Sequence, residues 1–371
     1  MESVYDGKSN CSGCAACYEV CPVGAIEMVP DEEGFQYPRI DQDLCVDCRA
    51  CQEACPVRRP DDFKSAGVPQ FYVAKHKSAK VLKVSTSGGA FTALSDVVLG
   101  LGGSIYGADF DDELRVVHTR AETPEQRDSM RISKYVQSQL SPIYDLLSAD
   151  LDSGKAAFFT GTPCQTAAIR SCFQDHPGND GLYICDLICH SVPSPRVWDD
   201  YKKMLAEEAG GRLVKIQFRS KQYAWSRENS NKGLMYLIEG EEDFREDDRY
   251  YQLFIQDNVI SRPSCYTCKF TDVRRASDIT IADYFGIEEF EPKLYDPLGV
   301  SLILANTAKG KNLLELSADK LHLEERPGTE ALTHQKRLSS PGDEPHSRKE
   351  FWADYLKNGL KACFISPGGN S

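Results

Sequence analysis

The chain has 371 residues and a formal net charge of −13, which disfavours a nucleic acid as the main partner because phosphate binding requires a basic surface. No apolar run approaches the roughly 20 residues of a membrane helix, and the first residues, MESVYDGKSN, lack a basic-then-apolar secretory signal. We therefore expect a cytoplasmic protein with no integral membrane segment, in which 15 cysteines indicate metal ligands rather than disulfides.

One cysteine pattern occurs twice near the start of the chain. C-x2-C-x2-C-x3-C-P spans residues 11–22 and again residues 45–56. In two-cluster ferredoxins, which this segment resembles, three cysteines of one set and the fourth of the other bind one 4Fe–4S cluster. We predict one cluster on Cys11, Cys14, Cys17 and Cys55, and a second on Cys45, Cys48, Cys51 and Cys21. Zinc is a poorer interpretation, because it prefers paired C-x2-C units.

A polar turn opens the first long helix of the larger domain. A charged stretch with Pro and Gly indicates a linker, and residues 71–76 a strand. Ser87, Gly88 and Gly89 then precede a helix from about Ala90, and such a turn can hold a phosphate on its backbone N–H groups. The alternative is that Ser87 only caps the helix.

The middle of the chain continues with alternating elements. The pattern predicts strands at 104–110 and 114–120, a polar loop with Arg131 and Lys134, and a helix near 139–150. An apolar strand then runs into Gly161 and Thr162, so that Cys164 lies at the start of a helix, where the dipole favours a thiolate. Cys164 is a candidate nucleophile, cluster ligand or buried small residue.

The last third of the chain predicts more strands and helices. We expect a strand from residue 182, a β-rich section from residue 213, strands at 277–286 and 300–307, and helices at 249–257, 308–317 and 351–361. Because strands and helices mostly alternate, residues 71–371 are predicted to be α/β.

Four further cysteines occupy separate turn-like contexts: Cys164, Cys189, Cys265 and Cys268. They could converge on a third 4Fe–4S cluster or on zinc, or only the C-x2-C pair Cys265 and Cys268 could be ligands. Spacing does not choose between thiolate sites of this kind. The remaining three, Cys172, Cys185 and Cys363, are expected to be packing residues.

Six short motifs follow one another in order: STSGGAFTAL, SKYVQS, TGTPCQ, DLICHSVPSP, FRSK with a later Trp, and RPSCYTCKF with RRASDITIADYFG. Through them, residues from about Phe71 to Gly286 resemble the β-subunit family of coenzyme F420 hydrogenases and dehydrogenases. One departure is Ser191, which follows His190 where the family usually has glycine.

The resemblance implies an FAD in the larger domain with a 4Fe–4S cluster beside it, bound by the four further cysteines. It makes Ser87, Gly88 and Gly89 candidate flavin-phosphate contacts, together with Gly161 and Thr162, and Lys134 a candidate contact to a flavin or substrate phosphate. FAD rather than a side chain is expected to carry the chemistry.

We therefore expect an α+β ferredoxin-like iron–sulfur module (1–60), a linker (61–70) and a larger α/β, mixed-sheet, flavin-binding domain (71–371, dividing near residue 155). The predicted function is an oxidoreductase that passes electrons through FAD between an organic hydride carrier, such as an F420-like deazaflavin, and the clusters. A redox partner protein or ferredoxin and a homo- or hetero-oligomer are expected. Alternatives are a ferredoxin-driven reductase of an unknown substrate, linked to glycan biosynthesis in some bacterial relatives, and an electron-transfer subunit without its own substrate.

Overall fold

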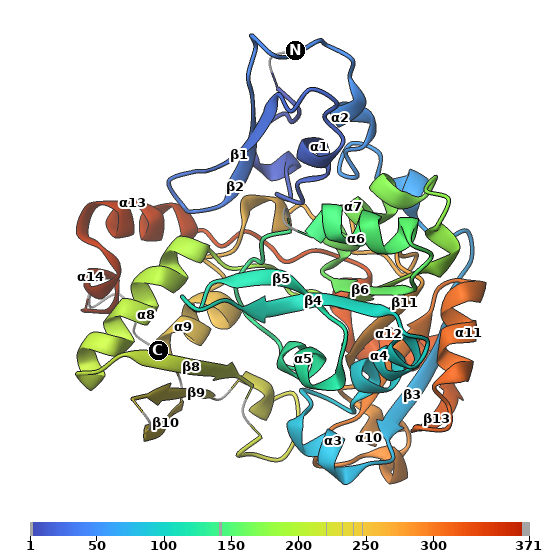
Figure 1. Cartoon of the computed structure of the whole chain (residues 1–371). Coiled ribbons are helices and arrows are strands. Elements are labelled where there is room, and N and C mark those ends of the chain that lie inside the picture. Colours follow the sequence, from blue (N-terminus) through green and yellow to red (C-terminus); the bar gives the residue numbers. More distant parts are fainter. Residues whose placement is uncertain are drawn as a thin grey trace.

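A small N-terminal module projects from a larger domain built around an eight-stranded sheet (Figure 1). The computed structural model describes residues 3–140, 143–219, 221–231, 233–239, 241–246 and 248–365. Within these ranges, no helix combines the length and the apolar character that a bilayer crossing requires.

The N-terminal module has one antiparallel hairpin and two single-turn helices. Strands β1 (Ile26–Pro30) and β2 (Gln36–Ile40) pair so that Ile26 lies opposite Ile40. Helices α1 (Ala16–Glu19) and α2 (Ala50–Glu53) begin inside the first and second cysteine motifs. The sequence repeat is therefore also a structural repeat.

Both motifs bend through the left-handed backbone region at equivalent positions. Gly13 and Ala15 have φ of 67° and 62°, and Asp47 and Arg49, each 34 residues later, have φ of 55° and 65°. Three of these residues are not glycine, and each costs on the order of 1–2 kcal/mol in this conformation. Both cysteine motifs therefore have the same strained backbone conformation at equivalent positions.

The larger domain is organised by a mixed sheet in the order β13-β3-β12-β11-β7-β6-β4-β5. Its strands are β3 (Gln70–His76), β4 (Ser104–Phe110), β5 (Val116–Ala121), β6 (Ala157–Gly161), β7 (Leu182–Leu187), β11 (Ile279–Asp283), β12 (Ser301–Ala305) and β13 (Leu321–Arg326). The neighbours β4, β6, β7 and β11 are parallel, and the remaining pairs are antiparallel. The predicted α/β domain with a mixed sheet is confirmed, whereas its boundaries stay a prediction.

A second, three-stranded antiparallel sheet lies beside helix α8. It contains β8 (Leu213–Phe218), β9 (Gly233–Ile238) and β10 (Glu241–Glu246). The helices of the larger domain are α3 (Ala79–Val84), α4 (Ala90–Gly100), α5 (Pro124–Asp128), α6 (Ile143–Asp152), α7 (Pro163–Phe173), α8 (Pro195–Ala209), α9 (Arg249–Tyr251), α10 (Ile287–Phe290), α11 (Ala308–Leu316), α12 (Gly328–His334), α13 (Arg348–Asn358) and α14 (Leu360–Ile365).

Tertiary contacts shift several predicted boundaries. The helix expected from residue 139 begins at Ile143, because Gln139 instead pairs with β5 through hydrogen bonds to Val116 and His118. The helix expected at 249–257 is a short α-turn followed by a π-helical turn, Gln252–Gln256. Strand β13 and helix α12 had no clear sequence signal.

The module docks through buried polar contacts as well as helix packing. Helix α1 packs against α7, and the Tyr144 hydroxyl donates to the Cys14 carbonyl at 2.8 Å. Arg348 forms a buried ion pair with Glu33. Since both charges are nine-tenths buried, the pair can form only while the module is seated on the larger domain.

Candidate functional site

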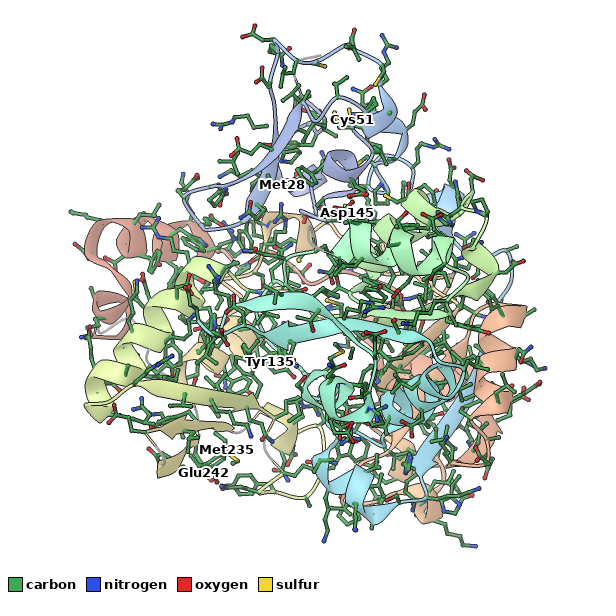
Figure 2. All side chains as sticks on the ribbon, in the orientation of Figure 1. Met28, Cys51, Tyr135, Asp145, Met235 and Glu242 are labelled. Atoms are coloured by element: carbon green, nitrogen blue, oxygen red, sulfur yellow. The ribbon has the colours of Figure 1, made fainter. Side chains whose placement is uncertain are left out.

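The eight cysteines of the module divide into a buried and an outer group. Cys11, Cys14 and Cys17 are each less than one-tenth exposed, whereas Cys48 is exposed. Cys51 is buried as well, but it lies in the projecting part of the module, away from the eight-stranded sheet (Figure 2). The first motif therefore faces the larger domain, and the second lies farther out, with Cys48 at the surface.

Neighbouring thiols cross between the two motifs. Burial raises the pKa of the Cys14 thiol to about 12, and the proximity of Cys55 and Cys11 adds to the rise. Burial also raises the pKa of Cys51, and the charges of Cys21 and Cys48 add to the rise. This crossed proximity is the arrangement that the sequence predicts for two clusters, and the ligand sets themselves stay a prediction.

The four cysteines of the larger domain converge from three separate segments. Cys164 is the second residue of α7, Cys189 follows β7, and Cys265 and Cys268 lie in the turn after residue 262. Burial raises the pKa of Cys189, and Cys265, Cys164 and Cys268 add to that rise in this order. The tertiary structure therefore brings all four thiols into one neighbourhood.

This neighbourhood is chemically suited to an iron–sulfur cluster. Burial raises the pKa of Cys265 to about 12 and that of Cys268 to about 11, so neutral thiols must lose protons when a metal binds. Zinc holds its ligands tightly around one ion, whereas a cluster spreads four thiolates over four irons. The choice between a cluster and zinc at these four thiols stays a prediction.

A cavity of about 550 Å³ lies at the carboxyl ends of β6, β7 and β11. Parallel α/β sheets bind ligands at this edge, because their loops gather there. The cavity is lined by five of the six predicted cofactor-binding residues, together with one proposed cluster ligand: Ser87, Gly89, Lys134, Gly161, Thr162 and Cys189. Tyr135, which also lines it, lies between β4 and β8 (Figure 2).

The sixth predicted residue, Gly88, lies behind the cavity wall. A Cβ on Gly88 would meet the Ser301 nitrogen at 2.5 Å and the Ala74 oxygen at 2.6 Å. Its carbonyl also accepts a hydrogen bond from the backbone of His76 at 2.8 Å. Gly88 therefore allows the turn to pack against β3 and β12.

The neighbouring residues of the turn present the start of α4 to the cavity. Gly89 is the N-cap of α4, with φ of 81° and no capping side chain. The Ser87 hydroxyl donates to the Val300 carbonyl at 2.8 Å instead of capping the helix. The first N–H groups of this eleven-residue helix thus stay available for an anion.

The sequence places Lys134 in a polar loop, but polar contacts fix the position of its side chain. Its ammonium group donates to the Ser129 and Ile132 carbonyls at 2.7 and 3.1 Å, and Asp109 lies 3.8 Å away. Burial lowers the pKa of Lys134 to about 8. Its charge acts on the cavity from a fixed position rather than from a mobile side chain.

Basic side chains dominate the charged lining: Arg131, Lys134, Arg219, Arg227, Lys336 and Arg337. The two carboxylates that line the cavity are already paired, Asp186 with Arg275 at 2.9 Å and Asp283 with Arg219 at 2.6 Å. The cavity is therefore electropositive in a protein of net charge −13.

Several buried polar atoms of the lining have no protein partner. Among the described residues they include His118 Nδ1, His190 Nε2, Arg219 Nε and Arg337 Nε. Buried polar atoms are normally hydrogen-bonded, so a ligand or water is expected to satisfy them. The sequence did not predict any of these four residues as a ligand contact. Arg219 could have been found because it falls in the FRSK motif, whereas a lone histidine or arginine in a sequence does not indicate a site.

The other three cysteines stay predicted packing residues. Cys185 is buried in β7 and also lines the cavity, Cys172 lies in α7 and packs against Cys14, and Cys363 packs against the cluster around α8 and α13. The Thr162 hydroxyl lies 3.2 Å from the Cys164 sulfur and belongs to the capping box of α7.

Comparison with protein families identifies both parts of the chain. Residues 10–58 match the 4Fe-4S dicluster domain, and residues 154–331 match the family described as the C terminus of the coenzyme F420 hydrogenase/dehydrogenase beta subunit. The resemblance inferred from the six motifs is confirmed, and the chain is an iron–sulfur protein related to the F420 hydrogenase β subunit.

Among solved structures, this chain is similar to a chain of the xenon-derivatised F420-reducing [NiFe] hydrogenase complex from Methanosarcina barkeri. The similarity covers 80% of this chain and 96% of that chain, with 17% sequence identity and a TM-score of 0.48. A comparison with curated proteins finds no match.

The convergence of the four core thiols gives a first prediction. Replacing Cys265 by Ala should remove about four irons per chain, because a cluster needs all its ligands. Iron and zinc measured on anaerobically purified protein test this. Cys363→Ala, a packing thiol near α13, is the control that should keep its iron, and an unchanged iron content in Cys265→Ala would contradict the ligand assignment.

A second prediction concerns acid sensitivity. Burial lowers the pKa of His118 to about 4, so the folded protein binds fewer protons there than the unfolded chain between about pH 4 and 6.5. Stability should therefore fall as the pH drops through this window, with His118 contributing about 2 kcal/mol between pH 7 and pH 5. Anaerobic denaturant titrations at both pH values should show a smaller loss in His118→Gln, whereas exposed His346→Gln should match the wild type.

Proposed function

We propose that this protein is an iron–sulfur flavoprotein oxidoreductase that passes electrons between an organic hydride carrier and ferredoxin-type clusters. The observation that carries the proposal is one shared cavity. It is lined at one point by the turn that opens α4 and at another by Cys189, one of the four converging thiols. An organic ligand in this cavity would lie beside a cluster on those thiols.

The residues present fit a flavin dinucleotide. A cavity of about 550 Å³ falls within the range of roughly 300–1,000 Å³ that cofactor sites occupy. The uncapped start of α4 offers N–H groups to a pyrophosphate, and Arg131 lies beside it, with its Nε 3.0 Å from Thr92 Oγ1 in the first turn of α4. A bound flavin would supply the chemistry that links a two-electron hydride carrier to one-electron clusters.

The side chains of the cavity have defined parts in this proposal. Arg131 and the start of α4 bind the phosphates, and Lys134 adds a fixed positive charge. Burial lowers the pKa of His118 and of His190 to about 4, so both rings stay neutral at pH 7 and offer a hydrogen bond without a charge. The apolar wall, which includes Phe254 and Ile281, excludes water.

The three cysteine groups form an ordered route. One of the core thiols, Cys189, lines the cavity, the group of Cys11, Cys14 and Cys17 is buried toward the larger domain, and the group with Cys48 reaches the surface. Exposed apolar side chains, Leu44 and Val46, flank the outer group. Electrons would pass along this series to or from a redox partner that docks there.

The substrate class is an anion. The basic lining attracts negative charge, and the family name points to coenzyme F420 as the first candidate among organic hydride carriers. Either direction of electron flow uses the same groups.

The proposal is tested by anaerobic purification with iron, zinc and FAD quantified together, followed by addition of reduced coenzyme F420. We expect about twelve irons and one FAD per chain, from three four-iron clusters, and oxidation of the reduced coenzyme as the FAD and the clusters accept its electrons. Clusters and FAD without coenzyme oxidation would keep the reaction class and remove this substrate. About eight irons with zinc and no FAD would contradict the flavoprotein proposal.

Arg131→Gln should weaken FAD binding about tenfold to a hundredfold, because a charge-assisted hydrogen bond contributes about 1.5–3 kcal/mol. Fluorescence titration of flavin-depleted protein measures the dissociation constant. Arg115→Gln is a matched control, since Arg115 is half-exposed, pairs with Asp111 and lies outside the cavity. Equal FAD affinity in the two folded variants would contradict the phosphate assignment.

A further inference from the structure

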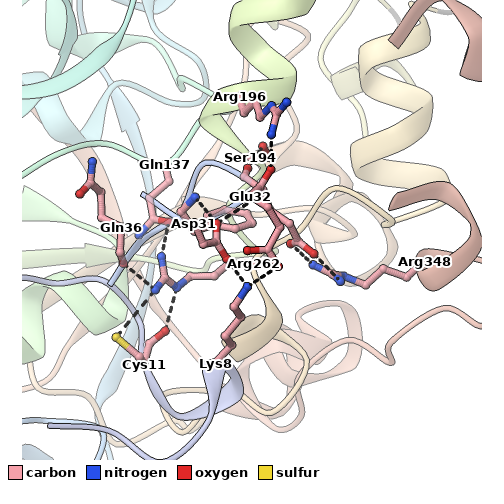
Figure 3. Close-up of polar contacts among 12 residues, drawn as sticks. Lys8, Cys11, Asp31, Glu32, Gln36, Gln137, Ser194, Arg196, Arg262 and Arg348 are labelled. Atoms are coloured by element: carbon pink, nitrogen blue, oxygen red, sulfur yellow. Dashed lines mark hydrogen bonds and ion pairs between the residues drawn. The ribbon is translucent and has the colours of Figure 1, made fainter. Parts of the chain in front are cut away.

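A single buried arginine connects the two iron–sulfur regions. Arg262 is 1% exposed, lies immediately before the Pro263–Cys265 turn, and reaches into the N-terminal module (Figure 3). Its backbone carbonyl accepts a hydrogen bond from the Cys265 nitrogen at 2.9 Å. Its side chain contacts Cys11, 251 residues earlier in the chain.

The guanidinium holds the first cysteine motif at several points. Nε donates to the Cys11 carbonyl at 2.8 Å, and Nη2 lies 3.8 Å from the Cys11 sulfur and 2.9 Å from the Gln36 carbonyl. Nη1 donates to Gln137 Oε1 at 3.0 Å. The guanidinium also lies over the Tyr37 ring, 4.3 Å from its centroid.

The guanidinium of Arg262 packs closely against Gly13 of the first cysteine motif. A Cβ on Gly13, between Cys11 and Cys14, would lie 2.7 Å from Arg262 Nη1. The glycine, which also has φ of 67°, is thus needed for the arginine to approach the motif.

The charge of Arg262 has no carboxylate counterion among its described contacts. Its partners are carbonyl oxygens, an amide oxygen, a thiol sulfur and an aromatic ring. An isolated buried cation is costly, so a neighbouring negative group is expected. A cluster on four thiolates is such a group, and its negative charge increases on reduction.

We propose that Arg262 is a positioning residue that is the buried counter-cation of the cluster on Cys11, Cys14, Cys17 and Cys55 and raises its reduction potential. Because a nearby cation stabilises the reduced, more negative cluster, this cluster is easier to reduce than it would be without the arginine. The inference rests on the cluster ligands of the proposed function and does not require the flavin.

The test is a potentiometric titration of the full-length, anaerobically purified protein, followed by electron paramagnetic resonance. In Arg262→Met, the cluster on Cys11, Cys14, Cys17 and Cys55 should become harder to reduce. Its ratio of reduced to oxidised form at a fixed potential should fall about tenfold, which equals about 59 mV for one electron. The cluster with Cys45, Cys48 and Cys51 should not change and is the internal reference. Arg262→Lys should recover part of the shift.

Two further variants separate charge from structure. Gln137→Glu leaves the arginine in place but gives it a carboxylate partner and removes the Gln137 Nε2 hydrogen bond to the Ser12 carbonyl; it should lower the same potential even if Arg262→Met loses its iron. Arg196→Gln is the matched control, because Arg196 also binds a carbonyl of the module, that of Glu32, at 2.6 Å, but does not contact Cys11 (Figure 3).

The outcomes are distinct. Unchanged potentials in both Arg262→Met and Gln137→Glu, or an equal shift in Arg196→Gln, would overturn this inference and leave the proposed function intact. A wild-type protein without the two clusters of the module would overturn the cluster assignment, and this inference with it.

Discussion

The carboxyl ends of three neighbouring strands, β6, β7 and β11, meet at one edge of the sheet, and the rest of the site depends on this constraint. Loops that leave parallel strands emerge on the same side, so segments about 100 residues apart become neighbours. Cys164 follows β6, Cys189 follows β7, and Asp283 ends β11. The cavity, the converging thiols and the turn of α4 share this edge because the strands are parallel there.

The charge at this edge of the sheet is opposite to the net charge of the chain. The chain is acidic overall, yet the carboxylates that line the cavity are paired with arginines: Asp186 with Arg275 and Asp283 with Arg219. Arg219 and Arg337 line the cavity, and the Nε atom of each has no hydrogen-bond partner among the described residues. A negatively charged surface around a positively charged cavity favours an anionic ligand there and a basic partner elsewhere.

The N-terminal module is tied to this site by buried polar contacts. Arg262 binds the first cysteine motif from the segment that also carries Cys265, and Arg348 forms a buried ion pair with Glu33 (Figure 3). Breaking such contacts would leave charges buried without partners, which costs several kcal/mol each. The module is therefore held in one orientation, with its buried cysteine group toward the core thiols.

The sequence by itself determined the two cysteine motifs, the family and the α/β character of the larger domain, because these depend on local spacing and periodicity. It also indicated that Ser87, Gly89, Gly161 and Thr162 belong together. Only the tertiary structure brought Cys164, Cys189, Cys265 and Cys268 into one neighbourhood, placed Gly88 behind the wall, and gave Arg262 and Arg219 their contacts. These contacts depend on strand order and domain docking. The sequence around a single arginine or cysteine does not indicate which distant residue it will contact.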